Sequence, residues 1–230
     1  MIFSRPTNTK MYASIIISAL NLSLISISNV YAHSNDPLTI DEISRVGNLV
    51  TPQTLAAKSE NGIATGIGTN DNQEVLLIER NEEKGAPKGQ RRADVYIYNY
   101  ATDELQETLV DLNTSEIISS VTKQGVQLPL TVNELKRAKE IVFEDEDERK
   151  ILEHEYNRIT SRTLNDTSEL NIKAFTFTAD SLPNRVNEAS KQCGIHRCAQ
   201  LMLYTDENIV FEISPIVNLS AGVVTQRIGF

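Results

Sequence analysis

The stretch Pro129-Leu130-Thr131-Val132-Asn133-Glu134-Leu135 closely repeats an earlier one, Pro37-Leu38-Thr39-Ile40-Asp41-Glu42-Ile43, 92 residues before it. In each copy a Thr can cap a helix, and the Glu three residues later can bond back to the backbone N–H of that Thr, which is a capping box. The Leu before the cap is placed to pack on the apolar residue five positions on, as in a hydrophobic staple. Two matched helix starts indicate an internal repeat.

Downstream of the first helix start, apolar residues recur at helical spacing up to the Thr51-Pro52 break. Residues 59–72 are rich in Gly and Asn, which favours a loop or an irregular strand. Four segments with strand-like patterns then follow, separated by short polar turns. We expect one helix packed on an antiparallel meander, with strands at 74–80, 92–100, 105–112 and 116–121.

The second helix start opens a similar series. The acidic run 144–148 is interpreted as a solvated segment that opens another helix at 149–159, and a metal-binding cluster is the alternative. Residues 197–204 parallel 91–98, and 217–219 parallel 110–112, so the repeat extends beyond the helix starts. Strands are expected at 174–179, 199–204, 209–213 and 223–228.

The N-terminus is typical of an export signal. Arg5 and Lys10 precede a Ser-interrupted apolar run, and Val30-Tyr31-Ala32 offers small residues for cleavage. Residues 1–32 are therefore expected to be a signal peptide, and the protein to be periplasmic or secreted. The alternative is a retained membrane anchor, because the uncharged stretch 11–32 is long enough to span a bilayer.

Cleavage after Ala32 would leave 198 residues and take the formal charge from -9 to -11. Such an acidic chain is a poor candidate for binding nucleic acid or an anionic membrane by bulk electrostatics. No second apolar run of spanning length follows the signal. The expected partner is therefore another exported protein or a small ligand, with no nucleic acid and no membrane contact after cleavage.

The only cysteines are Cys193 and Cys198, separated by Gly-Ile-His-Arg. In an exported protein this pair predicts one short disulfide, with Gly194 easing the turn. A redox pair or a soft metal site is the alternative, but the spacing is not CxxC, and no third or fourth ligand is evident.

The order of these motifs resembles the N-terminal accessory domains of copper amine oxidases, called N2 and N3. The resemblance rests on Pro-Leu-Thr-x-x-Glu, a strand ending Glu79-Arg80, then 92–95, 110–112, 117–121 and Gln127-Leu128-Pro129 before the second helix. It implies an α+β fold of two tandem cystatin-like units, each a helix packed on an antiparallel sheet. We place the first unit (N2-like) at 33–123 and the second (N3-like) at 124–230.

The catalytic domain of that family lies outside the resemblance. Its active site uses three copper-binding histidines, an Asp base and a Tyr in an Asn-Tyr-Asp/Glu string that becomes topaquinone. This chain has three histidines in unrelated contexts, and its one Asn-Tyr, Asn99-Tyr100, is followed by Ala101. No catalytic residue transfers, and no phosphate loop, HExxH or Gly-x-Ser-x-Gly motif is present. We therefore expect a protein that is not an enzyme and has no cofactor.

Copper binding is kept as an alternative function. A mature N-terminal His33 could chelate copper through its amine and imidazole, and His196 or His154 could complete the site. His33 is interpreted as part of a disordered leader, His154 as a surface residue and His196 as a loop residue within the disulfide. The leading hypothesis is an exported non-catalytic module that binds a protein or ligand. A cystatin-like peptidase inhibitor is a second alternative, by fold-level analogy.

Overall fold

The computed structural model describes residues 36–50, 68–70, 72–82 and 89–229. All of them belong to one compact unit, Ala32–Phe230. The expected signal peptide, His33 and most of the Gly- and Asn-rich segment 59–72 lie outside the described residues. Among the residues that are described, no helix combines the length and apolar character needed to span a bilayer.

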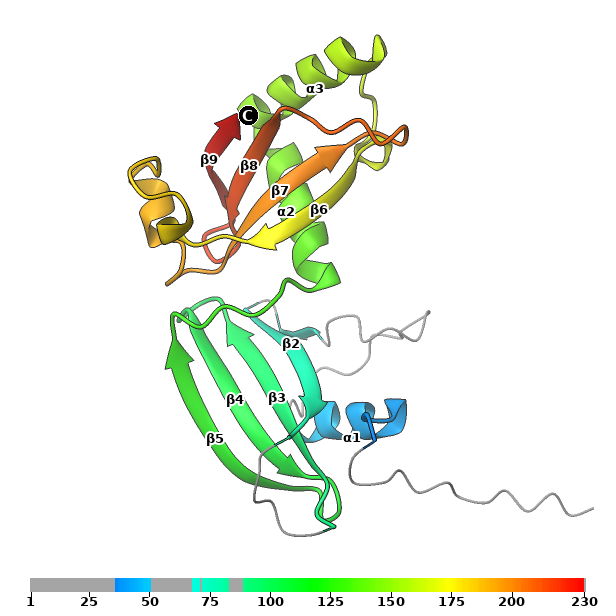
Figure 1. The fold of residues 1–230 in the computed structure, drawn as a ribbon, viewed down its shortest axis with the longest axis vertical. Helices are drawn as coiled ribbons and strands as arrows, with labels where there is room; N and C mark the ends of the chain where they lie inside the picture. Colours follow the sequence, from blue (N-terminus) through cyan, green and yellow to red (C-terminus); the bar gives the residue numbers. More distant parts are fainter. Residues whose placement is uncertain (1–35, 51–67, 71, 83–88, 230) are drawn as a thin grey trace, which may run out of the picture. The chain divides into compact units, whose positions relative to one another are not determined.

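The first half consists of helix α1 and a five-stranded antiparallel sheet (Figure 1). Helix α1 covers one face of the sheet near β2 and β3, and its buried Val46 meets Val95 and Val110 there. The strands follow the order β1-β2-β3-β4-β5. The elements are α1 (Ile40–Val50), β1 (Gly68–Asn70), β2 (Gln73–Arg80), β3 (Arg92–Asn99), β4 (Glu104–Asp111) and β5 (Glu116–Gln124).

The second half consists of two helices and a four-stranded antiparallel sheet of order β6-β7-β8-β9. Helix α2 packs on this sheet through its apolar face, where Ala138 and Val142 are fully buried. Tyr98, Tyr100 and Leu105 of the first sheet join the same core. The elements are α2 (Val132–Glu144), α3 (Glu146–Thr160), β6 (Asn171–Thr176), β7 (Cys198–Tyr204), β8 (Ile213–Asn218) and β9 (Val223–Gly229), with short 3-10 turns at Thr167–Glu169, Ala179–Ser181 and Ala189–Gln192.

Both helix starts form as the sequence predicts. The backbone N–H of Thr39 donates to Glu42 Oε2 at 2.8 Å, and Glu42 N donates to Thr39 Oγ1 at 3.2 Å. The second copy repeats the pattern, with Thr131 N to Glu134 Oε2 at 2.9 Å and Glu134 N to Thr131 Oγ1 at 3.1 Å. The α+β class is confirmed, since helices stand beside two antiparallel sheets.

One predicted strand is wrong. Residues 209–212 carry only an isolated bridge between Tyr204 and Val210, and the strand runs from Ile213 to Asn218, with Pro215 inside it. Proline lacks the N–H that a central strand donates. Here the β7–β8 ladder covers only 198–200 against 216–218, so Pro215 lies beyond it. Ser214 Oγ donates to Leu201 O at 2.7 Å and supplies a side-chain link in that region instead.

The acidic run 144–148 also differs from expectation. Asp145 caps α3 by accepting hydrogen bonds from Asp147 N and Glu148 N, as acids do at a helix start. Glu148, however, is buried and pairs with Arg227 of β9 at 2.5 Å, so this residue is not solvated. In the described part of the chain, no group of His, Cys, Asp and Glu is arranged to hold a metal ion.

Candidate functional site

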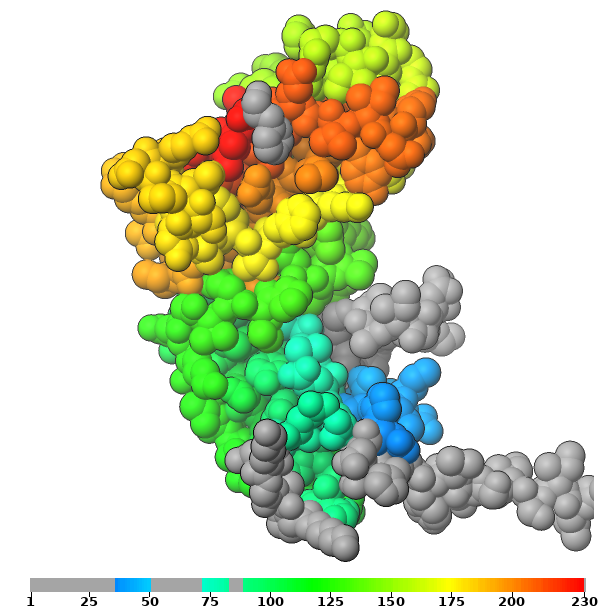
Figure 2. All heavy atoms as spheres, in the orientation of Figure 1, coloured from blue at the N-terminus to red at the C-terminus, as the bar shows by residue number. Residues whose placement is uncertain are grey.

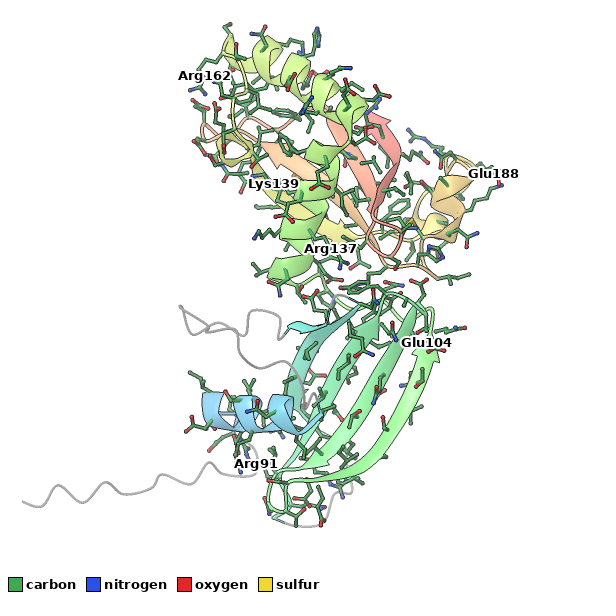
Figure 3. All side chains as sticks on the ribbon, turned by 180° about the vertical axis from the view of Figure 1, so that it is seen from behind. Arg91, Glu104, Arg137, Lys139, Arg162 and Glu188 are labelled. Carbon is green, nitrogen blue, oxygen red and sulfur yellow. A yellow bond between two sulfur atoms is a disulfide. The ribbon has the colours of Figure 1, made fainter. Side chains whose placement is uncertain are left out.

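Arg91 ties α1 to the first sheet. It lies just before β3, and its Nε and Nη2 donate to the two carboxylate oxygens of Glu42 at 2.6 and 2.9 Å. The same guanidinium donates to the backbone oxygens of Asp36 and Pro37 at 2.8 and 2.7 Å. Figure 3 labels Arg91 beside α1. The capping-box Glu therefore has two roles: it closes the helix start and anchors that start to the sheet.

Arg197 makes the matching arrangement in the second half. It lies just before β7 and donates to Glu134 Oε1 and Oε2 at 2.7 and 2.9 Å. It also donates to the backbone oxygens of Leu128 and Pro129 at 2.6 and 3.0 Å. Neither charged side chain is exposed. The sequence places Arg91 and Arg197 at parallel positions, but it does not indicate that each meets the capping-box Glu.

A second polar cluster joins β2 and the residue that follows β3, Tyr100, to the start of α2. The carboxylate of Glu74, 6% exposed, accepts a hydrogen bond from Thr131 Oγ1. Tyr100 Oη lies 3.1 Å from Glu74 Oε2 and 2.9 Å from Glu134 Oε1. The guanidinium of Arg137 stacks over the Tyr100 ring, 4.0 Å from its centroid. No local pattern in the sequence identifies Glu74 or Arg137, because these residues meet only in the folded chain.

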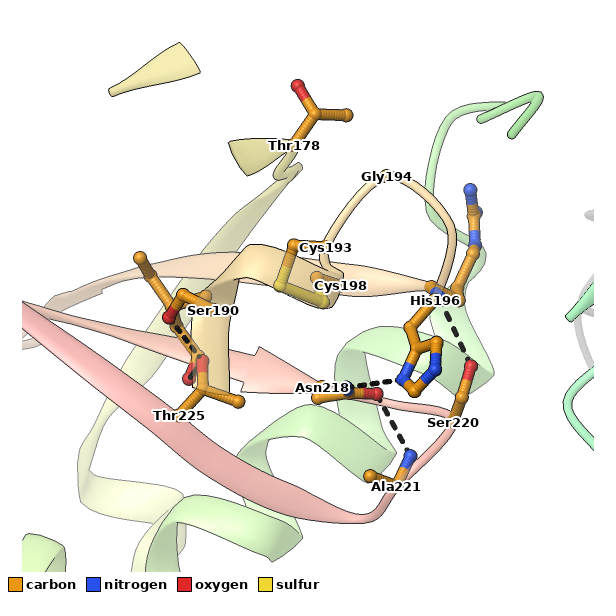
Figure 4. Close-up of a disulfide and its surroundings, with 12 residues drawn as sticks. Thr178, Ser190, Cys193, Gly194, His196, Cys198, Asn218, Ser220, Ala221 and Thr225 are labelled. Carbon is orange, nitrogen blue, oxygen red and sulfur yellow. Dashed lines mark hydrogen bonds between the residues drawn. A yellow bond between two sulfur atoms is a disulfide. The ribbon is translucent and has the colours of Figure 1, made fainter. Parts of the chain in front are cut away.

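The loop between the two cysteines contacts the end of the first sheet. Cys193 and Cys198 are joined by a disulfide with Cα atoms 5.4 Å apart (Figure 4). Gly194 has φ +112°, a conformation that favours glycine, so it permits the turn. Its carbonyl accepts from Gln127 Nε2 at 3.0 Å, and the carbonyl of Ile195 accepts from Tyr98 Oη at 3.2 Å.

His196 is held in the same loop, and its side chain is 30% exposed. Asn218 Oδ1 accepts from Ala221 N at 2.9 Å, which directs the amide nitrogen of Asn218 toward His196 Nδ1, also at 2.9 Å. Nδ1 therefore accepts a hydrogen bond, and Nε2 faces Asp103 Oδ2 at 3.5 Å. The ring is thus engaged at both nitrogens. His154 is exposed on α3, as expected, and His33 is outside the described residues.

An open cavity of about 560 Å³ lies beside the N-terminus of α1 and the end of β2. Leu38, Ile43 and Ile78 give it an apolar wall. Glu79 and Asp94, directly opposite each other in the β2–β3 ladder, give it a carboxylate rim, to which Glu82 adds a third acid. Arg80 also lines the cavity and pairs with Glu82 at 2.5 Å.

The acids of this face also surround a tyrosine of β3. Tyr96 lies on the first sheet near Asp94, Glu107 and Glu79, and burial together with these three carboxylates raises the pKa of its hydroxyl to about 12. Tyr96 is half-buried, whereas Tyr98 and Tyr100 are buried in the core. The three tyrosines in and directly after β3 therefore serve mainly in packing.

Strand β5 presents the most exposed apolar surface of the first sheet. It is the last strand in the sheet order, and all nine of its residues are exposed. Ile117, Ile118 and Val121 are 50%, 44% and 53% exposed. It appears at the edge of the sheet in Figure 1, and its green atoms lie at the surface in Figure 2. An exposed edge strand offers unpaired backbone groups to a partner strand.

Comparisons with known proteins show a partial structural likeness. No family model matches the chain, and no curated protein matches it. Among solved structures, a copper-containing benzylamine oxidase from Hansenula polymorpha is similar over 86% of this chain, with 14% sequence identity and a TM-score of 0.54. The match covers 30% of that oxidase chain. At this identity the likeness shows the fold alone, over a part of the larger enzyme.

Proposed function

We propose that this chain is an exported, non-catalytic module of two cystatin-like units that binds another exported protein along β5. The partial structural likeness to a copper amine oxidase supports an accessory rather than a catalytic role. The paired arrangements Glu42–Arg91 and Glu134–Arg197 support descent from a duplicated unit, because each joins a capping-box Glu to the Arg that precedes a strand.

The observation that carries the binding role is the exposed edge strand. A soluble protein usually shields such an edge with charge, a proline, a bulge or a covering element. Strand β5 has a register shift near Ile117 and carries one lysine, Lys123, which pairs with Glu107. The segment from Ser119 to Gln124 remains regularly paired with β4 and exposed on its outer side. It is suited to receive an extended segment of a partner by strand addition.

Site-specific photo-crosslinking in the exported compartment tests this proposal. A photoreactive residue at Val121 should give a defined product with a partner protein, and Ile118→Lys in the same chain should abolish it. Val223, 48% exposed on β9, is the matched control position and should give no such product. Equal products from both positions, or none from Val121, would contradict binding along β5. A product of two copies of this chain would show self-association instead of a separate partner.

The cavity beside α1 supports small-ligand binding as a second candidate. Its apolar wall and carboxylate rim suit a molecule with an apolar body and a positive charge. Glu79→Gln combined with Asp94→Asn should weaken binding of such organic cations in a thermal-shift screen. The β5 variants should leave this binding unchanged, so the two candidates can be separated.

A further inference from the structure

The cluster around Tyr100 contains one hydrogen too few if both of its carboxyl groups are ionised. Tyr100 Oη lies within hydrogen-bond distance of Glu74 Oε2 and Glu134 Oε1, yet a phenol has one proton to donate. With two carboxylates, one of these contacts would bring two oxygens together without a proton between them. A carboxylic acid at one site supplies the missing hydrogen.

The surroundings decide which carboxyl group carries that proton. Glu134 accepts two hydrogen bonds from Arg197 and a third from Thr131 N, so it is the acceptor of the ion pair. Among the residues that the structure describes, no guanidinium donates a hydrogen bond to Glu74: its Oε1 accepts from the Thr131 hydroxyl, and its Oε2 faces Tyr100. A protonated Glu74 can donate to Tyr100, and Tyr100 can then donate to Glu134.

The charged groups around Glu74 have opposing effects on its ionisation. From α2, Glu134 disfavours a second negative charge, whereas Arg137 favours it. On the opposing strand Glu74 faces Tyr98, which is neutral, and Arg197 is already engaged with Glu134. Burial is the largest influence and raises the pKa of Glu74 above its ordinary value of 4.5. The surroundings of Glu74 thus favour its protonated form, in agreement with the number of hydrogens that the contacts of Tyr100 require.

We propose that Glu74 is the protonated member of this cluster, and that its ionisation weakens the contact between β2 and the N-terminus of α2 as the pH rises. The contact includes the capping residue Thr131, so the change acts on the start of the helix that spans the second sheet. The protein therefore contains a pH-dependent contact between β2 of the first sheet and the start of α2, which packs on the second sheet. This contact is stronger at acidic pH and weaker toward alkaline pH.

The direction in which stability changes with pH follows from proton linkage. Because the pKa of Glu74 is higher in the folded protein than in the unfolded chain, the folded protein binds more protons between the two values. Stability from this group is fully present below the unfolded value of 4.5 and is lost as the pH rises through the folded value.

Infrared spectroscopy of the full-length mature protein tests the protonation directly. At about pH 6, where an ordinary Glu is ionised, the wild-type protein should show the C=O band of a protonated carboxyl group. The band should be absent from Glu74→Gln, whose amide can replace both hydrogen bonds, and retained in the exposed control Glu116→Gln. A missing wild-type band, or a band that persists in Glu74→Gln, would overturn the proposal.

A variant that removes a charge near Glu74 provides a second test, because a change in packing alone would not shift the pH at which Glu74 ionises. Replacing Arg137 by Gln removes the cation that favours ionised Glu74, so the pH at which the band disappears should rise. Over the same interval, the unfolding midpoint of the wild type should fall with rising pH, and that of Glu74→Gln should stay flat. The proposed pH-dependent contact would be contradicted if the band disappeared at the same pH in Arg137→Gln as in wild type. It would also be contradicted if the unfolding midpoints of wild type and Glu74→Gln changed equally with pH.

Discussion

Arg197 holds both carboxylate oxygens of Glu134, at 2.7 and 2.9 Å, and neither side chain is exposed to solvent. Replacing Arg197 by Met would leave a buried carboxylate without its cation, so we expect a loss of about 3–5 kcal/mol in the free energy of unfolding. Urea denaturation measures it. Lys136→Met, which breaks an exposed pair with Glu140, should leave the midpoint unchanged. A small effect of Arg197→Met would show that this ion pair does not anchor α2.

Acid unfolding should depend on Glu42. Its hydrogen bonds from Arg91 lower the pKa of Glu42 from 4.5 to about 2, despite the opposing effect of burial. The stability from this group is present above 4.5 and is lost as the pH falls through about 2. Glu42→Gln should therefore be less stable than wild type at neutral pH and lose less on acidification. Thermal unfolding across this pH interval checks the prediction, and an equal loss of stability on acidification in both proteins would refute it.

The disulfide should contribute both to stability and to the contact that its loop makes. Closing so short a loop restricts the unfolded chain by about 2 kcal/mol in the chain-entropy model. Cys193→Ser with Cys198→Ser should lower the free energy of unfolding by that amount. It should also speed amide exchange around Ile195 and His196, whose loop meets Tyr98 and Asp103. Intact mass before and after reduction establishes the oxidised state, and a mass equal to the reduced chain would contradict the disulfide.

Replacing an exposed apolar residue should change the free energy of unfolding much less than replacing a buried one. Ile118→Ser on β5 should change stability by no more than about 0.5 kcal/mol, because the side chain is already in water. Leu201→Ala on β7 removes a fully buried side chain and should cost about 2–5 kcal/mol. Both values come from the same denaturation series. A large loss for Ile118→Ser would indicate that β5 is covered in solution.

Short-range patterns predicted much of the fold. Helix α1 and its capping box, strands β2 to β5 and the start of α2 rest on residues within a few positions of one another. The sequence pattern places a strand at 209–213, whereas β8 covers Ile213–Asn218, because its pairing with β9 extends along that whole segment and depends on residues distant in the chain. The sequence pattern places Glu148 in a solvated run, because its partner Arg227 lies 79 residues away and leaves no local signal.

By itself, the sequence determined the α+β class, the two matched helix starts and the cysteine pairing to be tested, since these depend on local spacing and capping chemistry. Only the tertiary structure decided that Arg91 and Arg197 bind the capping glutamates, and that Glu74, Tyr100 and Glu134 share too few protons. The physical reason is distance along the chain. Glu74 and Glu134 are brought together by the packing of α2 and β2 around one hydroxyl group, and no periodicity in the sequence records that contact.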